Sequence, residues 1–147
     1  LLAKIPRERN PVKKAKLEIR LGRVKLLQAM EAFDGRHIED CYRLLEGYRE
    51  RMESAWATLE GSGRPAWKKP QGFKELDIAL RDDARLLEDF KHRVPYQARG
   101  PVEKVAQEIE QLRGLVLNAL FPPVPPDKPR QNFLPGTVTF PSEWPGA

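Results

Sequence analysis

Residues 38–60, IEDCYRLLEGYRERMESAWATLE, decide the fold of this chain because their apolar positions recur at a helical period. Steps of three and four residues separate the apolar side chains, and charged side chains fill most positions between them. The stretch therefore predicts an amphipathic helix that turns one face toward a core. Its apolar positions are Ile38, Cys41, Tyr42, Leu45, Tyr48, Met52, Ala55, Trp56 and Leu59.

The segment before this stretch, residues 11–34, predicts a second helix. Asn10 is a good N-cap, because its side-chain oxygen accepts from an exposed amide of the first turn. Pro11 follows at the first helical position, where a missing N–H costs nothing. Gly35 is expected to end the helix in the left-handed conformation that glycine adopts freely. With only a tight turn at Gly35, the two helices should be antiparallel neighbours.

The segments after residue 60 predict a second pair of helices. A Gly/Pro/Lys linker at residues 61–71 comes first. A helix then runs from about residue 72 to 92 and stops before Pro95, which disfavours helix in the residue preceding it. A fourth helix is expected from Pro101 to residue 120, closed by two further prolines.

We therefore predict an all-α fold, a four-helix bundle-like pair of helical hairpins over residues 1–121, with an extended C-terminal tail. Residues 122–147 hold eight of the 14 prolines, which favours a polyproline-like conformation. Apolar side chains in this tail are expected to pack it on the bundle. They are Phe133, Leu134, Phe140 and Trp144. The sequence has no solenoid-type repeat, and a distant duplication of the hairpin stays open.

Positive charge is concentrated at the start of the chain. The net charge is +5, yet residues 1–25 hold nine Lys/Arg against two Glu, a net of +7. Basic side chains on the first helix could neutralise phosphates of nucleic acid or anionic lipid. No aromatic residue is interleaved with them as a stacking platform, so a basic face paired with acidic residues of neighbouring helices is the alternative. The candidate polyanion-binding residues are Lys13, Lys14, Lys16, Arg20, Arg23 and Lys25.

Two tryptophans outside the helices are candidates for a surface that binds a protein partner. Trp67 lies in the predicted linker and Trp144 in the tail. Exposed tryptophan often marks a binding surface, although packing of the tail on the bundle is the alternative. The oligomeric state stays open, because helical hairpins with wide apolar stripes also complete their cores by dimerising.

The side chains typical of catalytic and metal sites are sparse. His37 and Cys41 share a helix face, but two ligands fall short of the three or four that a zinc site needs. Cys41 lies on the apolar stripe, so we expect a core cysteine. The neighbours Asp82 and Asp83 diverge by about 100° on a helix, which favours a solvated face. We therefore expect no catalytic residue, no metal site and no cofactor.

Three short motifs carry a resemblance to a known group of proteins. They are NPVKKAKLE at residues 10–18, RVKLLQA at residues 23–29 and LLEGY at residues 44–48. Residues 10–60 thereby resemble uncharacterised exported bacterial proteins with a basic α-helical hairpin domain of unknown function. The resemblance implies a helical hairpin and export, and it supplies no catalytic residues.

The sequence leaves both export and a cytoplasmic location open. The chain begins at Leu1 without a methionine, so we expect a mature or trimmed chain with room for an upstream signal peptide. No stretch approaches the roughly 18 consecutive apolar residues of a membrane span. We expect a non-enzymatic helical domain with a structural or protein-interaction role, and polyanion binding through the first helix is the alternative.

Overall fold

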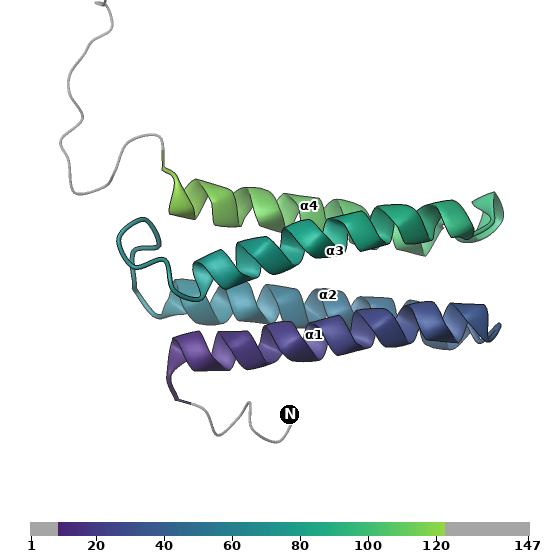
Figure 1. Ribbon diagram of the computed structural model, residues 1–147, viewed down its shortest axis with the longest axis horizontal. Coiled ribbons are helices and arrows are strands. Elements are labelled where there is room, and N and C mark those ends of the chain that lie inside the picture. Colours follow the sequence, from purple (N-terminus) through teal and green to yellow (C-terminus); the bar gives the residue numbers. More distant parts are fainter. Residues whose placement is uncertain (1–8, 123–147) are drawn as a thin grey trace, which may run out of the picture.

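The computed structural model describes residues 9–122, and all regular structure in this range is helical. Four long helices lie side by side (Figure 1). The predicted all-α fold is confirmed. Residues 123–147 of the predicted tail, Trp144 among them, lie outside the described range. The elements are α1 (Pro11–Asp34), α2 (Ile38–Gly61), α3 (Phe73–Arg93), the 3-10 turn η1 (Tyr96–Ala98) and α4 (Gly100–Leu120).

The start of α1 follows the sequence signals, and its end departs from them. The Asn10 side chain accepts from the backbone N–H groups of Val12 and Lys13, at 2.9 and 3.1 Å. The prediction of a left-handed Gly35 is wrong, because its φ is −84°. The next residue, Arg36, has the positive φ of 66° instead. The chain therefore reverses one residue later than the glycine indicated.

A glycine also fixes the entry into α3. Gly72 has φ 85°, and a Cβ there would lie 2.5 Å from Cδ2 of Leu59 on α2. Its backbone N–H donates to the Glu75 side chain at 2.7 Å, which closes the first turn of α3. Linker 62–72 is therefore held against the end of α2, and α3 starts one residue after the predicted position.

Within the first hairpin, α1 and α2 run in opposite directions. Ser54 and Thr58 on α2 donate to Glu18 on α1. Further along, the methyl group of Met52 lies next to Gly22, where a Cβ would be 2.7 Å from it. As the residue number rises on α1 it falls on α2, so the two helices are antiparallel, as predicted.

Between the hairpins, helices of like direction lie side by side. Arg23 on α1 pairs with Asp83 on α3, 60 residues later. Arg49 on α2 pairs with Glu108 on α4, 59 residues later (108 − 49). Lys16 on α1 likewise approaches Glu75 on α3, 59 residues later (75 − 16), so numbers rise together and α3 runs parallel to α1. The sequence colours of Figure 1 show α4 running in the direction of α2. One end of the bundle therefore carries the start of α1, the linker 62–72 and the end of α4 (Figure 1).

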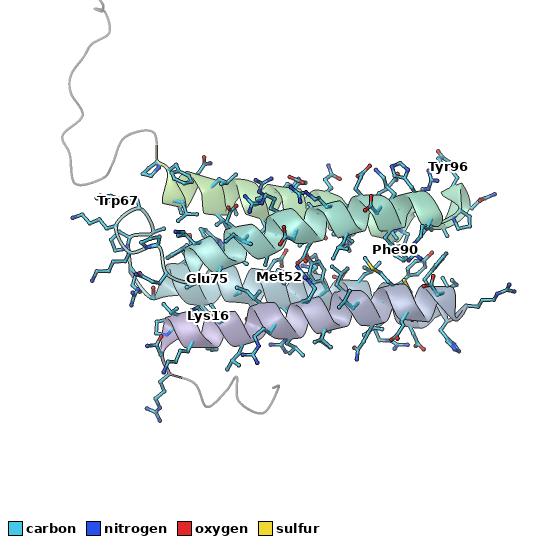
Figure 2. All side chains as sticks on the ribbon, in the orientation of Figure 1. Lys16, Met52, Trp67, Glu75, Phe90 and Tyr96 are labelled. Atoms are coloured by element: carbon cyan, nitrogen blue, oxygen red, sulfur yellow. The ribbon has the colours of Figure 1, made fainter. Side chains whose placement is uncertain are left out.

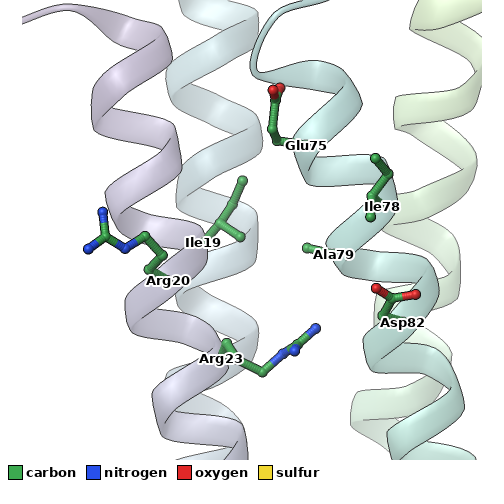
Figure 3. Close-up of a pocket in the computed structure, with 7 residues that line it drawn as sticks. All are labelled: Ile19, Arg20, Arg23, Glu75, Ile78, Ala79 and Asp82. Carbon is green, nitrogen blue, oxygen red and sulfur yellow. The ribbon is translucent and has the colours of Figure 1, made fainter.

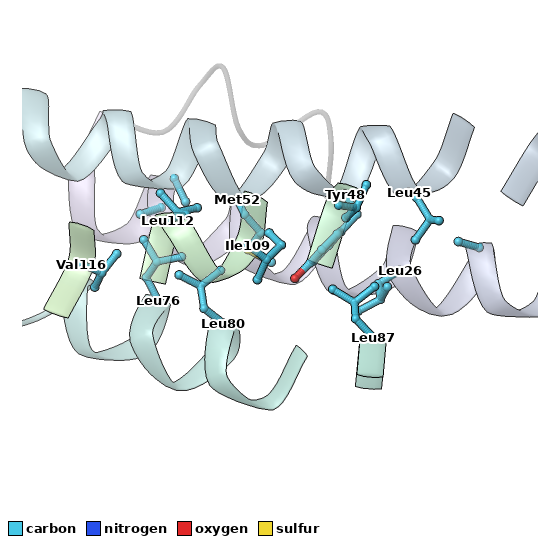
Figure 4. Close-up of a cluster of buried hydrophobic side chains, with 14 of the residues drawn as sticks. Leu26, Leu45, Tyr48, Met52, Leu76, Leu80, Leu87, Ile109, Leu112 and Val116 are labelled. Atoms are coloured by element: carbon cyan, nitrogen blue, oxygen red, sulfur yellow. The ribbon is translucent and has the colours of Figure 1, made fainter. Parts of the chain in front are cut away.

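The core fills the space between the two hairpins with apolar side chains from all four helices (Figure 4). Two edge-to-face aromatic pairs lie toward its ends. Phe33 meets Phe90 with 5.5 Å between ring centroids, and Trp56 meets Phe73 at 6.1 Å. Trp56 is thus partly buried against the core.

Candidate interaction surfaces

The bundle divides the predicted basic residues of α1 among different surroundings. Lys13 is exposed near the helix start. Lys16 approaches Glu75 on α3 at 3.8 Å. Lys25 lies along α2, where a Cβ at Gly47 would be 3.2 Å from its Cδ. Together with Lys14, Arg20 and Arg23, these three lysines make up the six candidate cations. The six form no continuous row on one free face.

Arg23 belongs to a polar cluster that joins three helices. Its Nε lies 2.7 Å from Oδ1 of Asp83 on α3, and its Nη2 lies 2.5 Å from the same oxygen. The hydroxyl of Tyr48 on α2 donates to Oδ2 of Asp83 at 2.9 Å. Both carboxylate oxygens are thus bound, which offsets the cost of burying the charge. Arg23 is therefore committed to holding α1 on α3.

Asp83 overturns the expectation of a solvated face. Its side chain is fully buried, unlike that of Asp82 beside it. Burial raises the pKa of Asp83, while Arg23 and the hydrogen bond from Tyr48 oppose the rise. Tyr48 itself is buried next to this carboxylate, and both effects raise the pKa of its phenol.

A second buried carboxylate, Glu18, was also missed in the sequence. It is 1% exposed and accepts from Ser54 at 2.5 Å and from Thr58 at 3.1 Å. Both buried acids stand in the apolar periodicity of their helices, and that is the signal that could have found them. Glu18 follows Ala15 by three residues, and Asp83 follows Leu80 by three.

An open groove of about 310 Å³ separates α1 from α3 (Figure 3). Its apolar floor comes from Ile19, Ile78 and Ala79. In Figure 3, Arg23 extends toward α3, whereas Arg20 extends away from it. Within the described residues, Arg20 and Asp82 line this groove without an ion-pair partner. The groove therefore has a basic wall, an acidic wall and an apolar floor.

A second groove, of about 390 Å³, lies between α2 and α4, and ion pairs occupy its rim. Arg49 Nη1 lies 2.6 Å from Glu53, and its Nε lies 3.3 Å from Glu108 on α4. Arg49 also binds Glu46, and this hydrogen bond lowers the pKa of that carboxyl. Glu53 and Glu46 accept hydrogen bonds from Arg49, whereas its Nε attracts Glu108 without a hydrogen bond. These ion pairs help to hold α2 on α4.

His37 and Cys41 do not form a reactive pair. Cys41 is fully buried, as predicted, and burial raises the pKa of its thiol to about 11. His37 is exposed at the start of α2, where its backbone carbonyl accepts from the Cys41 amide at 3.0 Å. Among residues 9–122, no group of three or more His, Cys, Asp or Glu side chains is placed to hold a metal ion.

Trp67 lies at the end of the bundle in the linker, as Figure 2 shows. It is partly exposed, and the Lys68 ammonium lies 5.0 Å from the centre of its ring. This contact is a cation–π interaction. Trp67 thereby adds an aromatic ring beside the linker lysines Lys68 and Lys69. The basic residues of α1 have no such aromatic neighbour in the sequence.

Comparisons with known proteins assign no family to the chain. No family model, no curated protein and no solved structure matches it. In the part of the chain described here, no helix is long and apolar enough to cross a bilayer. The functional argument therefore rests on the surfaces themselves.

Proposed function

We propose that this protein is a non-enzymatic interaction module that pairs with a second copy of itself through α1 and α3. The interacting surface, called the α1/α3 face, includes the first groove and its rim. The observation that carries the proposal is the groove with opposite charges on its two walls. The face comprises Lys16, Ile19, Arg20, Arg23 and Leu27 on α1, and Glu75, Ile78, Ala79 and Asp82 on α3.

Exposed apolar side chains gather near this face. Leu27 is 49% exposed and Ile78 is 45% exposed, and Val24 on the neighbouring turn of α1 is 43% exposed. Ile78 lines the groove, and Val24 and Leu27 lie one helical turn beyond Arg20 and Arg23 on α1. Isolated exposed leucines are ordinary, but several near one groove favour a binding surface. Covering them would remove apolar area from water, which is the main favourable term in association.

The arrangement of charge favours a second copy as the occupant. The basic wall of α1 and the acidic wall of α3 run parallel and at matching levels. A twofold axis along the helices sets each basic wall opposite the acidic wall of the other copy. A twofold axis across the helices would set basic on basic instead. Electrostatic complementarity therefore selects the parallel pair.

Two features support a non-enzymatic role. The buried Cys41 thiol stays neutral near pH 7, so it is a poor nucleophile. Both buried carboxylates, Glu18 and Asp83, are bound by neighbouring side chains. They stabilise helix packing through these hydrogen bonds.

Polyanion binding by α1 alone is less well supported by these positions. Arg23 is bound to Asp83, and Lys16 approaches Glu75. The acidic wall of α3 would repel a phosphate backbone laid along the groove. A polyanion would have to approach the start of α1 instead, away from that wall.

Charge reversal tests the pairing. In the proposed dimer, Arg20 of each copy faces Asp82 of the other, so the contact occurs twice. Arg20→Glu and Asp82→Arg each put like charges opposite one another at both contacts. We expect each variant to dimerise at least about tenfold more weakly than the unaltered chain in sedimentation analysis. Lys104→Glu, on the exposed surface of α4, is the matched control and should dimerise normally.

Mixing the two variants separates pairing between copies from pairing within one chain. A heterodimer of the Arg20→Glu and Asp82→Arg chains restores opposite charges at both contacts. We expect the mixture to associate about as well as the unaltered protein. A chain that stays monomeric up to about 1 mM, which corresponds to a binding free energy weaker than about −4 kcal/mol, would refute the proposal. Failure of the mixture to recover association would refute it equally.

A further inference from the structure

The positive charge of this protein collects at one end of the bundle, which we call the basic pole. It consists of residues 9–16, at the start of α1, and residues 60–75, which include the linker. The antiparallel hairpin brings these segments together, because α2 ends beside the start of α1. Its cations are Arg9, Lys13, Lys14, Lys16, Arg64, Lys68, Lys69 and Lys74.

The charge of this pole exceeds that of the whole protein. Its eight cations face two acids, Glu60 and Glu75, a net of +6. The full chain carries +5, so the remainder sums to −1. Glu75 is further engaged by the Gly72 amide and by Lys16. The pole therefore creates a strong positive potential at one end of a bundle whose other residues are nearly neutral in sum.

Aromatic side chains accompany the cations at this end. Phe121, which follows the last turn of α4, is 73% exposed. Trp67 is partly exposed beside Lys68 in the linker. The end of α4 from Leu115 to Pro122 carries no charged residue that would offset the field. Cations combined with exposed aromatic rings are typical of surfaces that meet the headgroup region of a membrane.

We propose that the basic pole binds an anionic lipid surface, with the helices standing end-on to the bilayer. Basic residues near an anionic leaflet attract its phosphate and carboxylate groups, and the exposed aromatic rings enter the interface. No helix of residues 9–122 can span the membrane, so the contact is peripheral.

A membrane fits the pole better than a nucleic acid does. The cations surround a blunt end made of helix termini and a linker, and they do not line a track along the bundle. One face of the Trp67 ring is taken by Lys68, which leaves little platform for base stacking. Along the side of the bundle, Glu75 and Asp82 oppose a phosphate backbone. A planar surface meets the pole, where Glu75 is engaged by the Gly72 amide and by Lys16, without meeting Asp82.

The test uses the full chain and vesicles of phosphatidylcholine with about 30% phosphatidylserine, an anionic lipid that gives the vesicle a negative surface potential. Co-sedimentation should show binding at low salt, a clear loss at about 0.5 M salt because of screening, and little binding to phosphatidylcholine alone. Lys68→Glu with Lys69→Glu should weaken partitioning at least about 25-fold, since each of the two lost basic residues contributes roughly fivefold near such a surface.

A matched control separates the pole from net charge. Arg85→Glu with Lys104→Glu makes the same change in charge on exposed sites of α3 and α4 outside the pole. This variant should bind close to the unaltered protein. Phe121→Ser should reduce binding several-fold without altering net charge, because it removes an apolar ring from the interface.

Three results would overturn the proposal. One is the absence of binding to anionic vesicles at low salt. A second is an equal loss of binding in the pole variant and the control, which would make the attraction a matter of total charge. The third is binding of a single-stranded oligonucleotide under conditions in which vesicles are ignored, which would make the ligand a nucleic acid. Circular dichroism of each variant establishes that it is folded before binding is compared.

Discussion

The two hairpins share one pattern of buried positions but fill it with side chains of different size. Ala29 in α1 and Phe90 in α3 are equivalent, because the buried positions recur 61 residues apart (90 − 29). Of seven such pairs of buried apolar residues, four are smaller in the first hairpin, two are leucine in both, and Tyr48 is larger than Ile109. The other pairs are Ala15/Leu76, Leu26/Leu87, Cys41/Val102, Tyr48/Ile109, Ala55/Val116 and Leu59/Leu120.

This difference sets how closely the helices approach. At Gly22 on α1, an added Cβ would lie 2.7 Å from Met52 and 3.3 Å from the Cβ of Arg51. Over their length, the backbones of α1 and α2 lie closer together than those of α3 and α4. The first hairpin is therefore held by close backbone approach, and the second by interlocking large side chains. The first should fail when a residue is enlarged, and the second when one is truncated.

The largest expected effect is truncation of the second hairpin at Phe90. Phe90→Ala leaves a cavity and removes the edge-to-face contact with Phe33. We expect the free energy of unfolding to fall by about 4 kcal/mol in urea denaturation. A loss below about 1 kcal/mol would mean that this hairpin relaxes around the cavity and is not held by interlocking side chains.

Enlargement of the first hairpin should come next. Gly22→Leu forces a side chain between α1 and α2 and should cost about 3 kcal/mol. Gly114→Leu is the control at an exposed glycine, where an added Cβ meets nothing within 4 Å. It should be neutral or stabilising by up to about 1 kcal/mol, because leucine has the higher helix propensity. Thermal and urea unfolding of both variants measures the contrast. Equal effects at the two glycines would mean that Gly22 is not a point of close approach between α1 and α2.

At the pair Gly22/Asp83, the second hairpin carries a buried charge where the first has a glycine. Burial raises the pKa of Asp83 in the folded state above its unfolded value. Its carboxyl therefore favours folding most at pH below the unfolded value of about 4, and this stability is lost as pH rises through the folded pKa. Relative to the unaltered chain, Asp83→Asn should gain stability over that rise.

Near pH 7 we expect Asp83→Asn to cost about 2 kcal/mol, because it removes one partner of the ion pair and leaves Arg23 or Tyr48 without its acceptor. Urea unfolding of both proteins between pH 3 and 7 measures the difference at each pH. If the variant instead becomes less stable as pH rises, then the attraction of Arg23 outweighs the burial of Asp83.

The smallest effect concerns Cys41, the counterpart of Val102. Burial holds its thiol pKa at about 11, above the ordinary value of 9.0. The neutral thiol favours the folded state, and this contribution is lost as pH rises from about 9 to beyond 11. At pH 8 a thiol reagent should modify the native protein far more slowly than the urea-unfolded protein. Equal rates would mean that α2 opens readily at this position.

The sequence specified the helices well because their signals are local. The Asn10 cap, the break before Pro95 and the apolar periods need only neighbouring residues to be read. Glu18 and Asp83 were missed because their burial depends on partners far away in the chain, such as Arg23, 60 residues before Asp83. The sequence predicts the left-handed residue of the first turn at Gly35, but it is Arg36. Glycine indicates that a turn is near and does not say which residue of the turn has the positive φ.

The candidate surfaces were less predictable than the helices. The basic residues of α1 were visible, but the parallel stacking of α3 on α1 was not, and this stacking creates the groove and commits Arg23. Lys68 and Lys69 likewise join Lys13 only because the hairpin returns the chain to the start of α1. Both proposed surfaces combine segments about 50 to 60 residues apart, which a periodicity argument treats separately.

Energy transfer between labelled copies tests the central claim, a parallel pair through the α1/α3 face, most directly. In a Cys41→Ala background, Gln71→Cys marks the basic pole and Gln97→Cys marks the opposite end; both sites are exposed. Helices of 21–24 residues separate these ends by roughly 30–35 Å. In a parallel pair, both basic poles lie at the same end of the dimer. Transfer should therefore be stronger between the same site on the two copies, 71 to 71 or 97 to 97, than between 71 and 97. Stronger transfer between unequal sites, or none at any concentration up to about 1 mM, would contradict it.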